Sequence, residues 1–187
     1  MKSSITVAVA ARRWALLLGL GFTVVAAAAE PVVELSDQQL PDATQVRDGL
    51  FPEDACKELE AASFKCMGFK PAVRFSLPAN TFKLGSAELP EMLRRQLDVF
   101  AEVLGGKKGS GRVIRVEGHA DASGAADANQ VLSQRRADAV RRYLIDKGAE
   151  PAMLEAVGLG TRSPKDSADP FAAVNRRVEI GRQPAKP

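Results

Sequence analysis

The strongest constraint on the fold is a change of hydrophobic period within residues 71–182. Residues 73–77 alternate between apolar and polar side chains, which is typical of a strand with one buried face. Over residues 89–104, leucines and one phenylalanine then recur at helical spacing, and Gly105 ends the pattern. The switch predicts a strand followed by a helix that packs on it.

The same switch recurs along the rest of the segment. Strands are expected at residues 113–117, 153–157 and 177–180, and a helix over 129–147 that ends at Gly148. The order β-α-β-α-β-β implies right-handed crossovers onto one mixed sheet, with the helices on one face. The predicted fold class is therefore an α/β (α+β) sandwich.

The first 29 residues have the pattern of a targeting segment. Bases ending at Arg13 precede an apolar run at 14–25, and alanines at 26–29 precede Glu30. Small residues before the cleavage point are typical of a secretory signal peptide, which we predict over residues 1–29. The alternative is an uncleaved membrane anchor, although the run is somewhat shorter than the roughly 20 residues a spanning helix needs. Either way, the chain is exported.

Two cysteines, Cys56 and Cys66, lie close together in the sequence. In an exported chain such a pair is expected to form a disulfide, worth roughly 2 to 3 kcal/mol for a loop of this length. Two buried free thiols are the alternative. A zinc site is disfavoured because the chain has one histidine and no further cysteine.

Charge divides the exported chain in two. Residues 30–70 carry nine acids and four bases, whereas residues 71–187 carry fourteen acids and nineteen bases. Residues 30–70 are therefore predicted to form an acidic arm that either packs on the basic domain at 71–182 or binds another envelope protein. Acids and bases balance after the leader, so nucleic acid is not an expected partner. Residues 183–187 are expected to be an unstructured tail.

One arginine stands on the apolar side of the helix predicted at 129–147. With Leu132 at zero and about 100° per residue, Val140 and Leu144 lie at roughly 80° and 120°. Arg136 lies at roughly 40°, inside this apolar arc. A guanidinium turned toward the sheet needs an anion, because an unpaired buried charge costs several kcal/mol.

An acid that could meet this arginine is Asp121, in the loop after the strand at 113–117. The run 118–124 is rich in small residues, which let a ligand approach the backbone. The loop and two helical turns can bring Asp121 beside Arg136. The residues leave two interpretations open: an internal salt bridge, or the two halves of a site for a zwitterion.

A set of spaced motifs runs in order through residues 71–182: Gly118-His119-x-Asp121, Gly124, Asn129-x-x-Leu132-Ser133-x-x-Arg136-Ala137, Gly158-x-Gly160, Pro164 and Asn175-Arg176-Arg177-Val178-Glu179. Together they resemble the OmpA-like peptidoglycan-binding domain of OmpA-type porins, peptidoglycan-associated lipoprotein and MotB-type stator proteins. The resemblance implies an OmpA-like fold and a site for the diaminopimelate of peptidoglycan stem peptides.

In that family the Asp of the first motif holds the ammonium of diaminopimelate, and the Arg of the Leu-Ser-x-x-Arg-Ala motif holds its carboxylate. The resemblance assigns these roles to Asp121 and Arg136. The chemistry agrees, because a carboxylate suits a cation and a planar guanidinium grips a carboxylate through two parallel bonds. In the empty site Asp121 and Arg136 could pair with each other.

Supporting roles fall on four more residues. Asn129 is expected to cap its helix, with ordering of the 118–128 loop or a ligand contact as alternatives. Ser133 is expected to bond backbone near Arg136. By resemblance, a base of the Asn-Arg-Arg motif, Arg176 or Arg177, lies near the ligand.

Two features depart from the family pattern. Ala120 replaces the usual threonine, and residues 84–86 replace a polar residue before the first helix, so one contact is expected to be lost at each.

His119 is expected to be packed and hydrogen-bonded. A metal site with Asp121 and Asp127 is not predicted, because too few oxygens converge.

The predicted protein is non-catalytic, needs no cofactor and lies in the periplasm of a Gram-negative bacterium, associated with the outer membrane. It is expected to bind peptidoglycan and to tether the wall to the envelope or to a partner. The alternative is an OmpA-like adaptor of an envelope or secretion assembly with weak or no wall binding. An enzyme is disfavoured because no nucleophile is placed by motif beside the single histidine.

Overall fold

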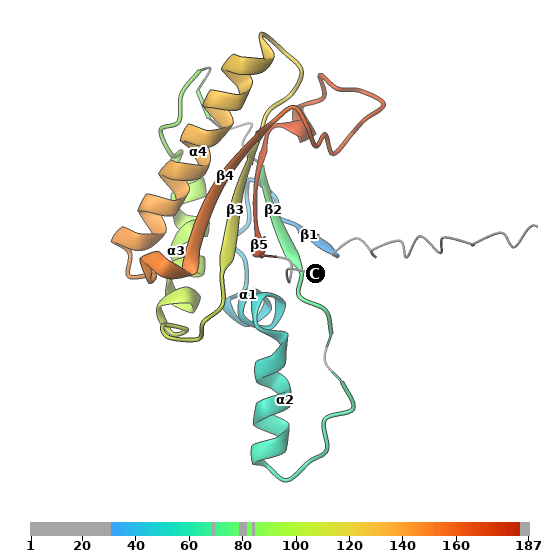
Figure 1. The fold of residues 1–187 in the computed structure, drawn as a ribbon, viewed down its shortest axis with the longest axis vertical. Helices are drawn as coiled ribbons and strands as arrows, with labels where there is room; N and C mark the ends of the chain where they lie inside the picture. Colours follow the sequence, from blue (N-terminus) through green and yellow to red (C-terminus); the bar gives the residue numbers. More distant parts are fainter. Residues whose placement is uncertain (1–30, 69, 79–81, 84, 184–187) are drawn as a thin grey trace, which may run out of the picture.

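A computed structural model describes residues 31–68, 70–78, 82–83 and 85–183. Its centre is one five-stranded mixed sheet with the spatial order β1-β2-β5-β3-β4 (Figure 1). The strands are β1 (Val32–Glu34), β2 (Arg74–Pro78), β3 (Ile114–His119), β4 (Leu154–Gly160) and β5 (Arg177–Arg182). Strand β5 is antiparallel to both β2 and β3, whereas β1 runs parallel to β2 and β3 runs parallel to β4.

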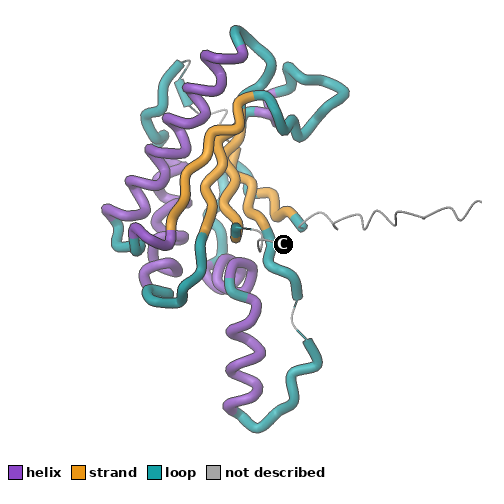
Figure 2. Tube along the Cα trace, viewed as in Figure 1, coloured by secondary structure: helices purple, strands orange, loops and turns teal. Residues whose placement is uncertain are grey.

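Helices α3 (Glu91–Gly105) and α4 (Ala126–Asp146) cover one face of the sheet (Figure 2). From β2 to β5 the chain follows the predicted order β-α-β-α-β-β, so the predicted fold class is confirmed. Short 3₁₀ turns, η1 (Pro151–Met153) and η2 (Ala173–Asn175), precede β4 and β5. The opposite face of the sheet, which we call the open face, carries no helix of the described chain.

The core lies between the sheet and α3 and α4. Phe75 of β2 meets Phe100 of α3 edge to face, with ring centroids 5.4 Å apart. Gly118 of β3 lets α4 approach closely, because a Cβ atom there would lie 2.1 Å from the carbonyl oxygen of Ser133. The inward side of α4 is therefore held against the end of β3, where Asp121 follows.

Several element boundaries differ from the prediction, and those of α4 and β4 lie beside the site. Helix α4 begins at Ala126, three residues before the expected start, because Ala125 already takes the extended conformation of a cap residue. Strand β4 continues to Gly160, since β3 keeps pairing with it as far as His119 across an irregularity in register. The loop between β3 and α4 is therefore shorter than expected.

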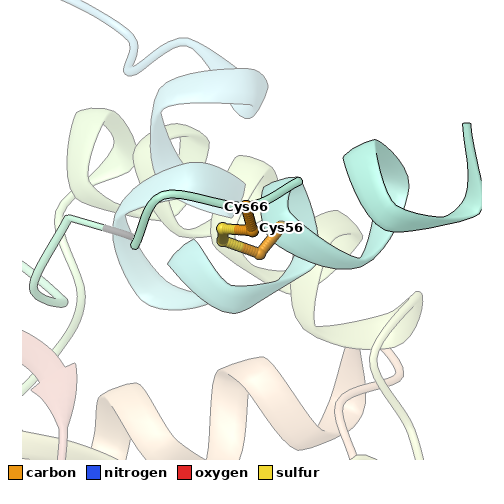
Figure 3. Close-up of a disulfide and its surroundings, with 2 residues drawn as sticks. All are labelled: Cys56 and Cys66. Atoms are coloured by element: carbon orange, nitrogen blue, oxygen red, sulfur yellow. A yellow bond between two sulfur atoms is a disulfide. The ribbon is translucent and has the colours of Figure 1, made fainter. Parts of the chain in front are cut away.

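The acidic segment packs on the rest of the molecule. Its strand β1 extends the sheet, and α1 (Ala43–Leu50) buries Val46 and Leu50 in the same core. After it, α2 (Pro52–Ala61) projects away from the sheet (Figure 1). The predicted disulfide is confirmed: Cys56 of α2 is bonded to Cys66, with their Cα atoms 5.3 Å apart (Figure 3).

The predicted signal peptide and its alternative, a membrane anchor, lie outside the described residues, as does most of the predicted tail. Within the part of the chain that the structure describes, none of the helices has the length and apolar character needed to cross a membrane.

Candidate functional site

Asp121 lies in the loop between β3 and α4 and is only 6% exposed. Its carboxylate accepts a hydrogen bond from the backbone N–H of Ser123 at 3.0 Å and forms an ion pair with Arg176. Burial acts to raise the pKa of Asp121, but the hydrogen bonds from Arg176 and Ser123 outweigh it, so the pKa is lowered. Asp121 is therefore an ionised carboxylate at neutral pH.

Arg136 reaches the same region from α4 and is 4% exposed. Its Nε donates to the carbonyl oxygen of Ser86 at 3.0 Å, and its guanidinium carbon lies 4.6 Å from the ring centroid of Phe82. Among the described residues it has no carboxylate within ion-pair distance. Burial and the nearby charge of Arg176 lower the pKa of Arg136, whereas Asp121 acts to raise it. An arginine stays charged regardless, so this is a buried, incompletely neutralised cation.

Three charges thus meet at the end of β3, and we call Asp121, Arg136 and Arg176 the site cluster. Asp121 pairs with Arg176 rather than with Arg136, so the internal salt bridge considered for Asp121 and Arg136 does not form. Both Asp121 and Arg176 still shift the pKa of Arg136, which places all three groups within electrostatic reach. One carboxylate facing two guanidiniums leaves the cluster with an excess positive charge.

The loop that carries Asp121 is ordered by Asn129. The amide nitrogen of Asn129 donates to the carbonyl oxygens of Asp121 at 3.1 Å and Ser123 at 2.8 Å. Capping, the expected role, is wrong: the cap residue is Ala125, and no side chain caps the helix there. The early start of α4 puts Asn129 inside the helix, from where its amide points back to the loop.

Ser133 of α4 and Ala120 of the loop both bond the end of β4 at Gly160. The Ser133 hydroxyl donates to the carbonyl oxygen of Gln130 and accepts from the backbone N–H of Gly160, both at 2.9 Å. Ala120 donates its backbone N–H to the carbonyl oxygen of Gly160, also at 2.9 Å. Ser133 bonds backbone groups through its hydroxyl, as predicted, and Ala120 bonds through its own N–H.

Of the two candidate arginines after Asn175, Arg176 reaches the site cluster. The buried Asn175 side chain accepts from the N–H groups of Lys165 and Asp166 and so orders the preceding loop. The same loop is joined to the site where Ala122 donates to the carbonyl oxygen of Pro170 at 2.9 Å. Arg177, the next residue along the strand, points to the open face instead.

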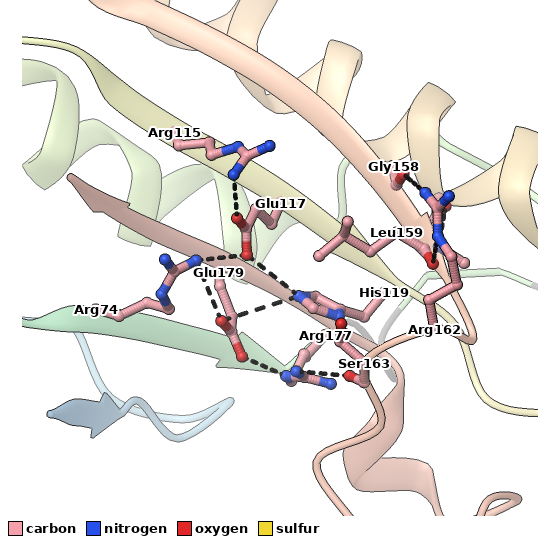
Figure 4. Close-up of polar contacts among 12 residues, drawn as sticks. Arg74, Arg115, Glu117, His119, Gly158, Leu159, Arg162, Ser163, Arg177 and Glu179 are labelled. Atoms are coloured by element: carbon pink, nitrogen blue, oxygen red, sulfur yellow. Dashed lines mark hydrogen bonds and ion pairs between the residues drawn. The ribbon is translucent and has the colours of Figure 1, made fainter. Parts of the chain in front are cut away.

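The open face carries a second group of charged residues, which we call the open-face network; Figure 4 labels all of its members except Glu155. Its members are Arg74, Arg115, Glu117, His119, Glu155, Arg177 and Glu179. Glu117 pairs with Arg74 and Arg115, and Arg115 also lies 3.6 Å from Glu155. Glu179 accepts from Arg177 at 2.5 Å. Three arginines thus face three glutamates.

His119 is packed at the centre of this network, with Nε2 3.8 Å from Glu117 and 3.9 Å from Glu179. Both contacts are longer than a hydrogen bond, so His119 is packed as expected but makes no hydrogen bond to either carboxylate. Burial and the charge of Arg177 lower the pKa of His119 to about 4, so the ring is neutral at pH 7.

One atom each from Glu117, His119 and Glu179 could in principle hold a metal, since these atoms lie within 4.8 Å of one another. Both carboxylates are already ion-paired with arginines, and a divalent cation would have to displace those pairs. The electrostatics therefore favour a structural role for this group.

Sequence reasoning missed two groups around Arg136. Phe82, which provides the ring beneath the guanidinium, and Ser86, which provides the carbonyl, lie in the segment before α3. A backbone carbonyl has no sequence signature, so only tertiary structure could place these contacts.

The fold and the sequence together define the class of protein. The OmpA family model matches residues 81–177, just over half of the chain, and the chain belongs to the OmpA family. Over 101 residues it is 42% identical to the peptidoglycan-associated lipoprotein of Pseudomonas aeruginosa, covering 53% of this chain and 58% of that protein. The chain thus spans little more than half the length of the curated relative.

Two further similarities are consistent with membership of the OmpA family. Outer membrane porin F of Pseudomonas fluorescens is 44% identical over 68 residues, 35% of this chain and 21% of the porin. The OmpA-like domain of FopA1 from Francisella tularensis shares the fold, with a TM-score of 0.50 and 21% identity over 60% of this chain and 75% of that one. The two curated relatives are a peptidoglycan-associated lipoprotein and an outer membrane porin, and the predicted location in the periplasm, associated with the outer membrane, is confirmed.

Proposed function

We propose that this protein binds peptidoglycan non-covalently through the diaminopimelate of stem peptides and tethers the cell wall to the envelope or to a partner protein. Its similarity to a peptidoglycan-associated lipoprotein supports the ligand class. The observation that carries the proposal is the site cluster, where Asp121 and Arg136 lie within electrostatic reach and Asp121 forms its ion pair with Arg176 instead.

The free end of diaminopimelate carries one ammonium and one carboxylate. The ammonium meets Asp121, which remains ionised and shares its oxygens with Arg176. The carboxylate meets Arg136: its Nε is held by Ser86, which leaves the Nη1 and Nη2 edge for two parallel hydrogen bonds. Because Phe82 and Ser86 already fix the guanidinium, little side-chain entropy is lost on binding.

The proposed role is binding without catalysis. The chain has a single histidine, and His119 lies on the open face, with its pKa lowered to about 4. Both cysteines are in the disulfide. Asp121 and Arg136 therefore act as fixed charges, and we assign no proton transfer or nucleophilic attack to them.

The tethering role has support in the arrangement of the elements. The site cluster lies where β3 ends and α4 begins, whereas α2 projects at the other end of the molecule (Figure 1). The wall and a second envelope component could therefore be bound at the same time. Under this proposal α2 and the chain up to Cys66 form the partner side.

Sedimentation with purified sacculi tests the proposal. We expect the protein to sediment with diaminopimelate-containing walls and not with lysine-containing ones. Asp121→Ala and Arg136→Ala should each weaken binding by at least about 30-fold, because a ligand charge left unpaired costs roughly 2 to 5 kcal/mol. Arg135→Ala, the same charge change on the exposed side of α4, is the matched control and should bind normally.

Other outcomes decide between the proposal and its rivals. Unchanged sedimentation of both Asp121→Ala and Arg136→Ala would overturn the proposed site. A protein partner retained without any wall would favour the adaptor, to which the loss of the threonine hydroxyl at Ala120 also points. Release of soluble muropeptides would show an enzyme instead.

A further inference from the structure

Next to the site cluster lies a cavity of about 260 Å³, and Arg176 of the cluster forms part of its lining. The cavity lies between β1 and β2 on one side and η2 on the other, and its lining includes Lys165, Arg176 and Arg177 together with Glu34. Ala173 and Val174 of η2 add a small apolar wall. It has the size and shape for a short group with an anionic end.

The charge of the lining favours an anion. The lining holds three bases and one carboxylate, Glu34, which pairs with Lys165. Arg176 and Arg177 pair with carboxylates outside the lining, Asp121 and Glu179 respectively. Arg177 uses Nε for Glu179 and Nη2 for Ser163, but its Nη1 is buried without a hydrogen-bond partner among the described residues. A buried donor of this kind costs free energy until an acceptor arrives.

The cavity and the site cluster share a residue. Arg176 lines the cavity and also pairs with Asp121, so the two sites are adjacent. Successive residues of an extended peptide lie about 3.3 to 3.6 Å apart. A stem peptide anchored by its diaminopimelate can therefore reach the cavity with the residue that follows.

We propose that this cavity is a second subsite that binds the free C-terminal carboxylate of the same stem peptide, with a small apolar side chain against Ala173 and Val174. The inference rests on the proposed function, because the anchored diaminopimelate delivers the carboxylate. The protein then distinguishes stem peptides with a free end from those whose end is blocked by an amide or a crosslink.

The test uses two synthetic stem tetrapeptides that contain diaminopimelate, one ending in a carboxylate and the other in a carboxamide. Calorimetric titration of the exported chain should give about tenfold tighter binding of the carboxylate form, as expected for a charge-assisted hydrogen bond. Lys165→Gln, which removes a base of the lining, and Val174→Trp, which fills the cavity, should each bring the two affinities together. Lys108→Gln, an exposed lysine distant from the cavity, should keep the preference.

The failure of this inference is distinguishable from failure of the proposed function. Equal affinities for the two peptides in the unaltered protein, with both lost in Asp121→Ala, would overturn the subsite and leave diaminopimelate binding intact. A preference that persists in both Lys165→Gln and Val174→Trp would also overturn it. If neither peptide binds, the proposed function and the subsite fail together.

Discussion

Two groups of charged side chains, the open-face network on the sheet and the site cluster at the end of β3, differ in their charge balance. In the open-face network three arginines face three glutamates. In the site cluster Asp121 is the sole carboxylate for Arg136 and Arg176. A balanced network needs no further charge for neutrality, whereas an unbalanced one gains from an added anion. Charge balance therefore separates a structural cluster from a binding site more clearly than burial does.

The largest effect is expected from breaking the open-face network. Glu179→Ala would leave Arg177 without its carboxylate in a buried position, and should lower the free energy of unfolding by about 3 to 5 kcal/mol. Urea denaturation measures the change. Glu155→Ala, on the same face but 42% exposed, is the control and should cost less than about 1 kcal/mol. Similar losses in the two variants would contradict the structural role of the network.

The sequence predicted what depends on local pattern. Alternation over residues 73–77 and helical spacing over 89–104 placed β2 and α3, because burying one face imposes that period whatever the partner. The same helical spacing predicted that Arg136 faces the sheet, because it places Arg136 among the apolar residues of α4. Strand β1 escaped prediction because three residues are too few to show a period.

The partners of the charged groups could not be predicted in this way. Arg176 lies 55 residues after Asp121, and no spacing rule joins a loop to the start of a distant strand. Arg115, Glu117 and His119 alternate along β3 as a solvent-facing side would. Glu117 pairs with Arg74 of β2, and Arg115 pairs with Glu155 of β4. The neutral His119 packs beside Glu117 and beside Glu179 of β5, and only the sheet order reveals these neighbours.

Acidic pH should affect the open-face network, through His119, before it affects the site cluster. His119 has a pKa of about 4 in the folded protein, below the unperturbed value near 6.5. Between these values the unfolded chain binds a proton that the folded chain does not, so stability should fall as the pH drops from about 6.5 to about 4, by on the order of 3 kcal/mol. Asp121, whose pKa is lowered, stays ionised over most of this range.

Unfolding curves measured across that pH range check this prediction. In His119→Gln, which removes the titrating ring, the decline over this range should become much shallower. An unchanged slope in His119→Gln would assign the pH dependence to another group.

Reduction of the disulfide should lower stability without touching either charge group. The bond joins α2 to the chain at Cys66, and opening the loop should cost roughly 2 to 3 kcal/mol. Thermal unfolding with and without reductant measures the cost, and a Cys56→Ser, Cys66→Ser double variant is the control for side effects of the reductant. Sedimentation with sacculi should not change. Loss of binding on reduction would mean that the acidic segment shapes the site.

The smallest effect on stability, and the sharpest contrast, is expected for Arg136→Met. Methionine keeps the contact with Phe82 but removes a buried cation that has no carboxylate partner among the described residues. The free energy of unfolding should therefore stay within about 1 kcal/mol of the original or rise, while binding to sacculi is lost. Arg177→Met, which removes the hydrogen-bonded arginine partner of Glu179 and leaves that carboxylate with Arg74 at 3.6 Å, should instead destabilise the protein strongly. Equal destabilisation by Arg136→Met and Arg177→Met would mean that Arg136 is as structural as Arg177, and the distinction between the two charge groups would fail.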